Sequence, residues 1–156
     1  MEPRADRPHL PGYGISPDAE GLLPWSWAAQ RLGPAHGYLV ATVDASGRPH
    51  LAAVWGVWWR DAFWFSTAGR KARNLAGEPR CSVTTGDTAE SVVVEGVARR
   101  ETDPDVLADL GAVYRAKYGG GFPDDSPVFA VEPEVAFGMV EAEFTERATR
   151  WRWSAQ

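Results

Sequence analysis

The sequence has one cysteine, Cys81, and no long hydrophobic segment. One cysteine cannot form an internal disulfide, and the apolar residues around it predict a buried, unreactive thiol. No apolar run reaches the roughly 18 residues that a membrane-spanning helix needs, and the first residues lack the pattern of a signal peptide. These absences predict a cytoplasmic protein that has no membrane partner.

Positive charge is also scarce, with 16 Lys and Arg against 21 Asp and Glu and a net charge of −5. A nucleic-acid-binding protein needs many cations to neutralise phosphates, so nucleic acid is not an expected partner. The cations are unevenly placed, because five of them but only two acidic residues lie from Arg60 to Arg80. A small positive patch in an acidic protein predicts a site for a small anion.

Motifs for nucleophilic or metal catalysis are missing. The three histidines, His9, His36 and His50, are far apart and lack the spacing of metal ligands. There is no Gly-x-Ser-x-Gly sequence, and no histidine lies near the cysteine in the chain. We therefore expect no metal site and assign no catalytic side chain.

The length and composition predict one domain. With 156 residues, of which 44% are hydrophobic, the chain can bury a single core. Residues 1–24 are rich in Pro and Gly and lack periodicity, so we expect an N-terminal strap or arm there and the domain proper at 25–156. The eight tryptophans indicate aromatic packing in a core, at a subunit contact or around a flat ligand.

Hydrophobic periodicity predicts a mainly β protein with few helices. We expect strands at 38–43, 50–59, 63–67, 80–85, 91–100 and 149–153, two strands within 126–144 separated at Pro133, and helices at 24–32, 68–79 and 102–121. Helices do not alternate with strands, which argues against a parallel sheet. The short connections predict a closed or partly closed antiparallel barrel.

The strand at 50–59 is unusual because residues 51–59 include no charged or hydroxyl side chain. Both of its faces should therefore be covered. We expect the odd-numbered residues from Leu51 to Trp59 to fill the barrel interior. On the other face, Gly56 leaves a gap that either receives a flat ring or marks a bulge or barrel corner beneath a second subunit.

The segment 65–75, FSTAGRKARNL, ends the next strand and begins a helix. A helix N-terminus attracts anions, Arg70 can bind a phosphate through two parallel hydrogen bonds, and Lys71 adds a point charge. Ser66 and Thr67 can donate to the remaining oxygens. The simpler alternative is a solvated helix face whose cations pair with nearby acids.

These pieces together resemble the pyridoxamine 5′-phosphate oxidase-like family of flavin-binding split barrels, in particular its small flavin- and deazaflavin-dependent oxidoreductases. The similarity extends from Tyr38 to Trp153 and is carried by ATVDASGRPHLAAVWGVW, AFWFST, RKARNL, VVVEGVA and TRWRW. The resemblance implies a six-stranded antiparallel Greek-key split β-barrel with flanking helices, a homodimer, and cofactor sites at the dimer interface. It also implies cofactor-binding roles for Val54, Trp55, Gly56, Val57, Trp58, Ser66, Thr67, Arg70, Lys71, Ser91, Arg150 and Trp151.

Two departures from the family pattern limit what the resemblance implies. Gly69 stands where many members have a hydroxyl residue, and ATRWRW replaces the Arg-Leu-His substrate signature. We therefore do not expect oxidation of vitamin B6. The pattern fits either FMN or the deazaflavin coenzyme F-420, and Arg48 or Arg73 could contact the acidic tail of the deazaflavin.

The leading hypothesis is an oxidoreductase that transfers a hydride between FMN or deazaflavin and a small conjugated acceptor. Hydride transfer needs orientation and exclusion of water rather than a protein nucleophile, and the loop from Lys117 to Pro127 could act as a lid. One alternative is a non-catalytic protein that binds a cofactor, haem or fatty acid in the same groove. Another is a dimeric scaffold without a ligand.

Overall fold

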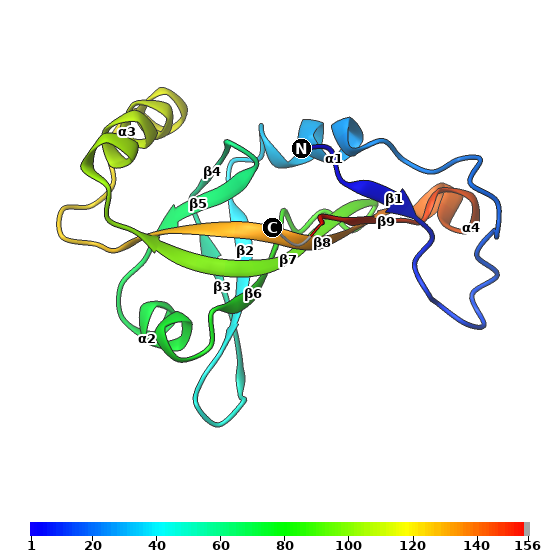
Figure 1. Ribbon diagram of the computed structural model, residues 1–156, viewed down its shortest axis with the longest axis horizontal. Helices are drawn as coiled ribbons and strands as arrows, with labels where there is room; N and C mark the ends of the chain where they lie inside the picture. The colour runs from blue at the N-terminus through cyan, green and yellow to red at the C-terminus, as the bar shows by residue number, and fades with distance from the viewer. Residues whose placement is uncertain (155–156) are drawn as a thin grey trace.

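The computed structural model describes residues 1–154 as a closed antiparallel barrel surrounded by helices (Figure 1). The strands are β1 (Arg4–Asp6), β2 (Tyr38–Val43), β3 (Pro49–Val54), β4 (Val57–Trp59), β5 (Ala62–Ser66), β6 (Arg80–Thr84), β7 (Glu90–Glu101), β8 (Val128–Val140) and β9 (Thr149–Arg152). The helices are α1 (Trp25–Leu32), α2 (Arg70–Gly77), α3 (Pro104–Tyr118) and α4 (Phe144–Arg147), with a 3-10 turn at Glu141–Glu143. Within residues 1–154, no helix is both long enough and apolar enough to cross a bilayer.

Six strands close the barrel: β2, β6, β7, β8, β5 and the segment 49–59. This segment appears as two strands because β3 pairs with β2 whereas β4 pairs with β5. It therefore joins the two ends of the sheet. The predicted six-stranded antiparallel split barrel is confirmed, although the sequence pattern treats 50–59 as one uninterrupted strand.

The side chains of β3 face opposite to the prediction. Leu51 and Ala53 are exposed, as is Trp55 just beyond the strand, whereas Val54 packs against the interior cluster. The prediction that odd-numbered residues fill the barrel was therefore wrong for β3, and it also fails in β4, where Val57 and Trp59 join the cluster with α3 while Trp58 packs against the interior cluster. When both faces of a strand are apolar, alternation cannot identify the inner one, and here the interior is already filled by aromatic residues of β5.

The strands β7 and β8 extend beyond the barrel to carry additional strands. The first part of β8 pairs with β5, and its last part pairs with β9. We expected two strands separated at Pro133, but β8 is continuous because the register shifts between Glu95 and Gly96 and forms a bulge opposite the proline. A Cβ atom at Gly96 would lie 2.2 Å from the Glu132 carbonyl oxygen, so glycine is needed at this close approach.

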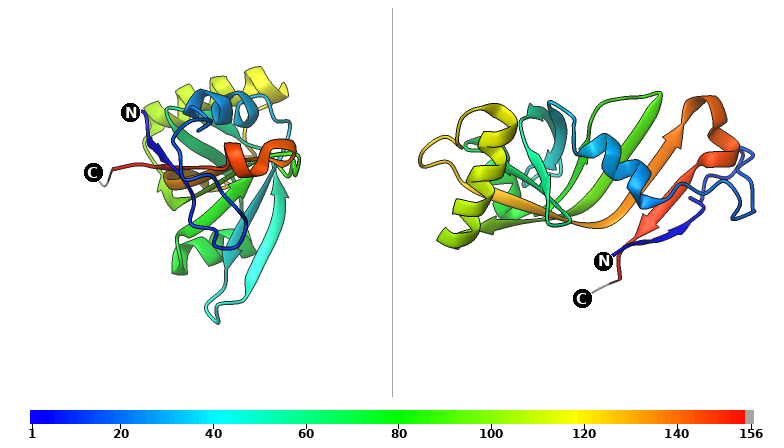
Figure 2. Two further views of the ribbon diagram at one scale, coloured as in Figure 1. Left: turned by 90° about the vertical axis from the view of Figure 1, so that its right-hand side faces the viewer. Right: turned by 90° about the horizontal axis from the view of Figure 1, so that it is seen from above.

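Three hydrophobic clusters connect the barrel to its helices. The interior cluster includes Phe63 and Phe65, whose rings stack at 5.6 Å. A second cluster packs α1 around Trp151, and a third joins α3 to the outer face of β5 through Leu110 and Tyr114. The helices α1 and α3 lie on the same side of the barrel and α2 on the other (Figures 1 and 2).

The first 24 residues follow the sheet edge before they reach α1. Strand β1 pairs with β9, and Figure 2 shows the two side by side. The Arg7 guanidinium donates to two carbonyls of this N-terminal segment and to those of Glu146 and Ala148, at 2.6 to 2.9 Å. One side chain thus ties the N-terminal segment to the end of α4.

Candidate functional site

The predicted anion site lies where β5 leads into α2. Ser66 ends β5, and the Thr67 N–H donates to the Pro127 carbonyl at 3.0 Å, which fixes this connection to the start of β8. Gly69 then adopts a φ of 67°, in the left-handed region that favours glycine, and α2 begins at the next residue. The glycine that departs from the family pattern is thus suited to the turn itself.

The inner face of α2 anchors the helix to the barrel. The Asn74 side-chain amide donates to the Thr42 hydroxyl at 3.0 Å, and Leu75 is buried in the interior cluster. With these anchors inward, Arg70 is exposed and Lys71 is half-buried at the start of the helix. The fold therefore places both cations beside the free N-terminus of α2.

Several polar groups at the start of α2 lack partners in the part of the chain that the structure describes. Among residues 1–154, no ion pair involves Arg70, Lys71 or Arg73. No side chain caps the helix N-terminus, and the buried Ser66 Oγ has no hydrogen-bond partner. Buried polar atoms without partners are uncommon in folded proteins. These groups are therefore available to an external anion.

His50 on β3 belongs to the same cluster. Burial and the charges of Arg70 and Lys71 lower the pKa of this imidazole from its ordinary value of 6.5. The side chain is therefore largely neutral at pH 7 and can accept or donate a hydrogen bond. We add His50 to the candidate anion site.

Removing either cation is expected to raise the pKa of His50, because each positive charge disfavours protonation of the imidazole. Since this pKa in the folded protein lies below 6.5, protonation favours the unfolded chain, and stability is lost as the pH falls from 6.5 through the folded-state pKa. Arg70→Ala and Lys71→Ala should each reduce that loss. An NMR titration of the ring proton measures the pKa, with the His9 resonance as a reference. Unchanged titration in both variants would remove His50 from the cluster.

The second predicted feature is the gap at Gly56, and side-chain and main-chain atoms of the protein itself fill it. A Cβ atom on Gly56 would lie 2.4 Å from Phe63 Cζ and 2.7 Å from the Trp64 carbonyl oxygen. The glycine therefore marks the corner at which the segment 49–59 passes from β2 to β5. The sequence allowed either a bound flat ring or a barrel corner as the reason for a glycine at position 56. The barrel corner explains the glycine without any ligand.

This corner nevertheless lies near the cation cluster. Val57 pairs with Trp64, and Ser66 is two residues further along β5, about 7 Å along the strand. Among the predicted ring-binding residues 54–58, Val57 is buried, whereas Trp55 is 52% exposed. Trp55 therefore presents an exposed apolar ring near the predicted anion site.

Two other predicted site residues lie at the far end of the sheet. Ser66 pairs with Val128 of β8, whereas Ser91 pairs with Met139 of the same strand, so that about 36 Å of strand separate them. Arg150 pairs with Phe137, also toward the far end. The structure therefore does not bring Ser91 and Arg150 to the cation cluster within one chain.

Arg150 and Trp151 are also engaged inside the chain. Arg150 Nε lies 2.8 Å from the Asp6 carboxylate, and this hydrogen bond lowers the pKa of Asp6. Trp151 is 0% exposed, and its indole N–H donates to the Leu23 carbonyl at 3.0 Å. Gly138 makes room for this ring, since a Cβ atom there would lie 2.4 Å from it. The predicted contact of Trp151 with a cofactor therefore has no support in this geometry.

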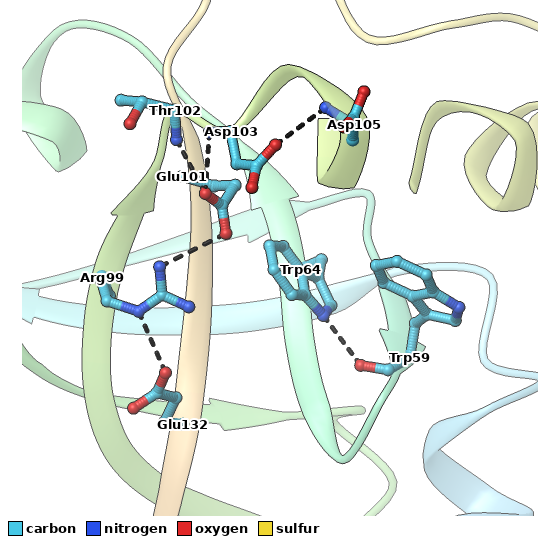
Figure 3. A network of polar contacts seen from close by, with 8 residues as sticks. All are labelled: Trp59, Trp64, Arg99, Glu101, Thr102, Asp103, Asp105 and Glu132. Carbon is cyan, nitrogen blue, oxygen red and sulfur yellow. Dashed lines mark hydrogen bonds and ion pairs between the residues drawn. The ribbon is translucent and has the colours of Figure 1, made fainter. Parts of the chain in front are cut away.

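A groove of about 670 Å³ lies elsewhere, between the start of α3 and the outer faces of β7 and β8. Figure 3 shows that its polar groups are paired: Arg99 donates to Glu132 at 3.0 Å and to Glu101 at 3.3 Å. Glu101 also accepts from the main-chain N–H groups of Thr102 and Asp103. With these groups satisfied and more acids than bases in its walls, the groove suits a phosphorylated ligand less well than the start of α2 does.

Sequence reasoning missed the contribution of α3 to the corner. Lys117 and Tyr118 both hydrogen-bond to the main chain of Gly56, which lies about sixty residues earlier in the chain. At the end of the predicted helix, the sequence indicates for Lys117 only a favourable charge near a helix C-terminus, and for Tyr118 nothing. No local sequence signal indicates that such residues contact a distant strand.

A family model described as pyridoxamine 5′-phosphate oxidase matches residues 30–146 of the chain. The matched segment includes all six barrel strands and the cation cluster at α2. No curated protein sequence matches significantly.

Solved structures share the fold. A conserved hypothetical protein from Mycobacterium tuberculosis has a TM-score of 0.66 at 22% identity, and the match covers 86% of this chain and 88% of that one. An F-420 reductase has a TM-score of 0.57 at 20% identity over 78% of this chain and 98% of its own. The haem storage protein HutZ from Vibrio cholerae has a TM-score of 0.53 at 23% identity, over 64% and 82%. At these identities the likeness establishes the fold alone.

Proposed function

This chain belongs to the pyridoxamine 5′-phosphate oxidase family, and from that premise we propose that it is an oxidoreductase that binds a phosphorylated flavin or deazaflavin between two subunits. The cofactor is FMN or coenzyme F-420, and the substrate is a small conjugated acceptor that takes up a hydride. The F-420 reductase of the same fold supports the deazaflavin as a candidate.

The unpaired polar groups at the start of α2 carry this proposal. Among residues 1–154, Arg70 and Lys71 form no ion pair, although the charge of Arg70 helps to lower the pKa of the nearby Asp44, and the buried Ser66 Oγ has no hydrogen-bond partner. A phosphate group would satisfy all of them, because its oxygens accept from the two cations, the hydroxyl and the free helix N–H groups. The residues present therefore fit the phosphate of either cofactor.

The bound cofactor would supply the hydride chemistry, so the chain needs only to bind, orient and exclude water. Arg70 and Lys71 would fix the anionic end of the cofactor. Trp55, near this cluster, offers exposed apolar surface to a flat ring, whereas Val54 packs against the barrel interior. The lid role of the loop that follows Lys117 stays a prediction.

Two subunits are needed if the distant predicted residues take part in binding. Ser91 and Arg150 lie toward the opposite end of β8 from Ser66, as the positions of α2 and β9 in Figure 1 illustrate. In a twofold dimer, this far end of one subunit can approach the cation cluster of its partner. We therefore propose a homodimer in which each site draws residues from both chains.

An apolar outer face supports the dimer. Leu51 is 62% exposed and Trp55 is 52% exposed, although both are large hydrophobic residues. Leu39 and Ala41 of β2 pair with Ala53 and Leu51 of β3, and they continue the same face. A contiguous apolar surface of this kind is typical of a subunit interface.

Leu51→Asp is expected to dissociate the dimer. The twofold contact would place one unpaired carboxylate per subunit in an apolar interface, which should raise the dimer dissociation constant by roughly a thousandfold or more. Sedimentation velocity measures this change. Tyr13→Asp is the control, because Tyr13 is 64% exposed but lies on the N-terminal segment away from this face. A monomeric wild type, or a dimer that survives Leu51→Asp, would contradict the assignment.

The absorbance spectrum of the purified protein tests the cofactor. Oxidised FMN gives two visible bands and the deazaflavin one, and titration with each cofactor then gives its affinity. We expect one of them to bind stoichiometrically and to support turnover of a conjugated acceptor. Failure to bind either cofactor would contradict the proposed function.

Non-catalytic binding is the second candidate, because the haem storage protein HutZ shares the fold. A protein of this kind would hold a haem, lipid or cofactor in the interface groove without turnover. A Soret band, or a cofactor that stays bound and unreactive with every acceptor, would favour this function over the oxidoreductase.

A further inference from the structure

Lys117 and Tyr118, the last two residues of α3, contact the barrel corner. Lys117 Nζ lies 2.9 Å from the Gly56 carbonyl oxygen and 2.9 Å from the Tyr38 hydroxyl. The Tyr118 hydroxyl accepts from the Gly56 N–H at 3.0 Å and lies 2.7 Å from the His36 carbonyl oxygen, to which it can donate. One helix end therefore binds both main-chain polar groups of Gly56.

The sheet does not supply these hydrogen bonds itself. Pairing with β2 stops at Val54, and pairing with β5 starts at Val57, so Gly56 lies in the gap between the two ladders. Gly56 is also buried, and a buried main-chain group without a partner is strongly unfavourable. Lys117 and Tyr118 replace the bonds that the strand loses where it turns.

The Lys117 ammonium contacts neutral oxygens and aromatic rings instead of an acid. Among residues 1–154 no ion pair involves it, and it lies 4.8 Å from the ring centroid of Tyr38 and 5.2 Å from that of Tyr118. Partial burial lowers its pKa. A half-buried charge without a carboxylate is unfavourable in itself, and its position is explained if it holds a particular conformation of the corner.

The same helix end fixes the orientation of Trp55. The indole stacks on the Tyr118 ring with a centroid distance of 4.6 Å and an interplanar angle of 1°. The His36 ring meets the indole edge-on at 5.6 Å. Although Trp55 is about half exposed, its ring is thus held in one plane next to the corner.

We propose that Lys117 and Tyr118 are positioning residues that hold the corner at Gly56, so that the exposed Trp55 ring beside it is oriented to meet the ring of the cofactor. This inference rests on the proposed function, because it assigns the surface of Trp55 to that cofactor. The cofactor is then held by two separate devices: α2 binds its phosphate, and α3 shapes the surface that meets its ring.

The first experiment measures exchange of the Gly56 amide proton by NMR in the ligand-free protein. Tyr118→Phe removes the hydroxyl but keeps the ring that stacks on Trp55, and Lys117→Met removes the ammonium but keeps the length of the side chain. Tyr118→Phe should exchange this proton at least about tenfold faster, because the acceptor of its hydrogen bond at a buried site is lost. Lys117→Met removes the bond to the Gly56 carbonyl and leaves the amide bonded to Tyr118, so it should speed exchange to a smaller extent by loosening the corner. Arg115→Met is the control, since Arg115 is an exposed cation on the same helix. Unchanged exchange in both variants overturns the proposal.

The second experiment compares the affinities for FMN, F-420 and inorganic phosphate. Tyr118→Phe and Lys117→Met should weaken binding of the cofactor that the wild type prefers by about tenfold and leave phosphate affinity unchanged, whereas Arg70→Ala with Lys71→Ala should weaken both. Cofactor affinity equal to wild type, or an equal loss of phosphate affinity, overturns the positioning role. A wild type that binds neither cofactor contradicts the proposed function instead.

Discussion

Replacing Arg70 and Lys71 together by alanine is expected to lower the affinity for FMN or F-420 by roughly 10²- to 10⁴-fold. Each charge-assisted hydrogen bond to a phosphate contributes about 1.5 to 3 kcal/mol, and the double variant removes two such donors. The fold should persist, because Arg70 is exposed and neither side chain forms an ion pair among residues 1–154. Titration followed by cofactor absorbance or tryptophan fluorescence gives the affinities.

Two control variants show whether the loss of cofactor affinity is specific to Arg70 and Lys71. Arg115→Ala removes one exposed cation from α3, and Arg73→Ala removes one from α2 beyond its first residues. Neither should change FMN affinity by more than about twofold, because solvent screens exposed charges that do not contact the phosphate. Arg73→Ala should weaken only F-420 if this residue contacts the acidic tail. Equal affinity in wild type and the Arg70/Lys71 double variant would refute the phosphate assignment.

Trp151→Ala is expected to cause the largest loss of stability, about 3 to 5 kcal/mol in the free energy of unfolding. The ring is fully buried, and its centroid lies 5.3 Å from that of Trp25 and 6.4 Å from that of Trp27. Its indole N–H donates to the Leu23 carbonyl. Its removal would leave a large cavity and an unpaired acceptor beneath α1. Chemical denaturation measures the change.

The same substitution separates a core role from a ligand role for Trp151. Tyr13→Ala is the comparison, because it removes an aromatic ring that is 64% exposed and should change the stability by less than about 0.5 kcal/mol. If Trp151→Ala kept wild-type stability but lost cofactor affinity, the ring would have to lie at the cofactor site, as the family resemblance implied, and the buried position described above would not be the functional one.

The proximity of the residues in the predicted anion site could be derived from the sequence because they are close together in it. Ser66, Thr67, Arg70 and Lys71 span one strand end and one helix start, so their proximity needs no tertiary contact. The structure adds that, among residues 1–154, Arg70 and Lys71 form no ion pair, and that His50 lies near them on β3. A histidine sixteen residues before Ser66 gives no sign in sequence that it shares this cluster.

The tryptophans show where sequence patterns fail. Trp55 stands between Val54 and Gly56 and is about half exposed, whereas Trp151 stands between two arginines and is fully buried. The difference arises from Gly138, which admits the Trp151 ring, and from the outward orientation of the odd-numbered residues of β3. Neither cause can be derived from the residues adjacent to each tryptophan.

The sequence by itself determined the antiparallel barrel and the cationic turn before α2, because strand periodicity and helix starts depend on residues a few positions apart. Only the tertiary structure decided which face of β3 points inward, that α3 holds the corner at Gly56, and that Ser91 and Ser66 lie at opposite ends of β8. Those features depend on packing and on hydrogen bonds between segments far apart in the chain, and such contacts leave no periodic pattern in the sequence.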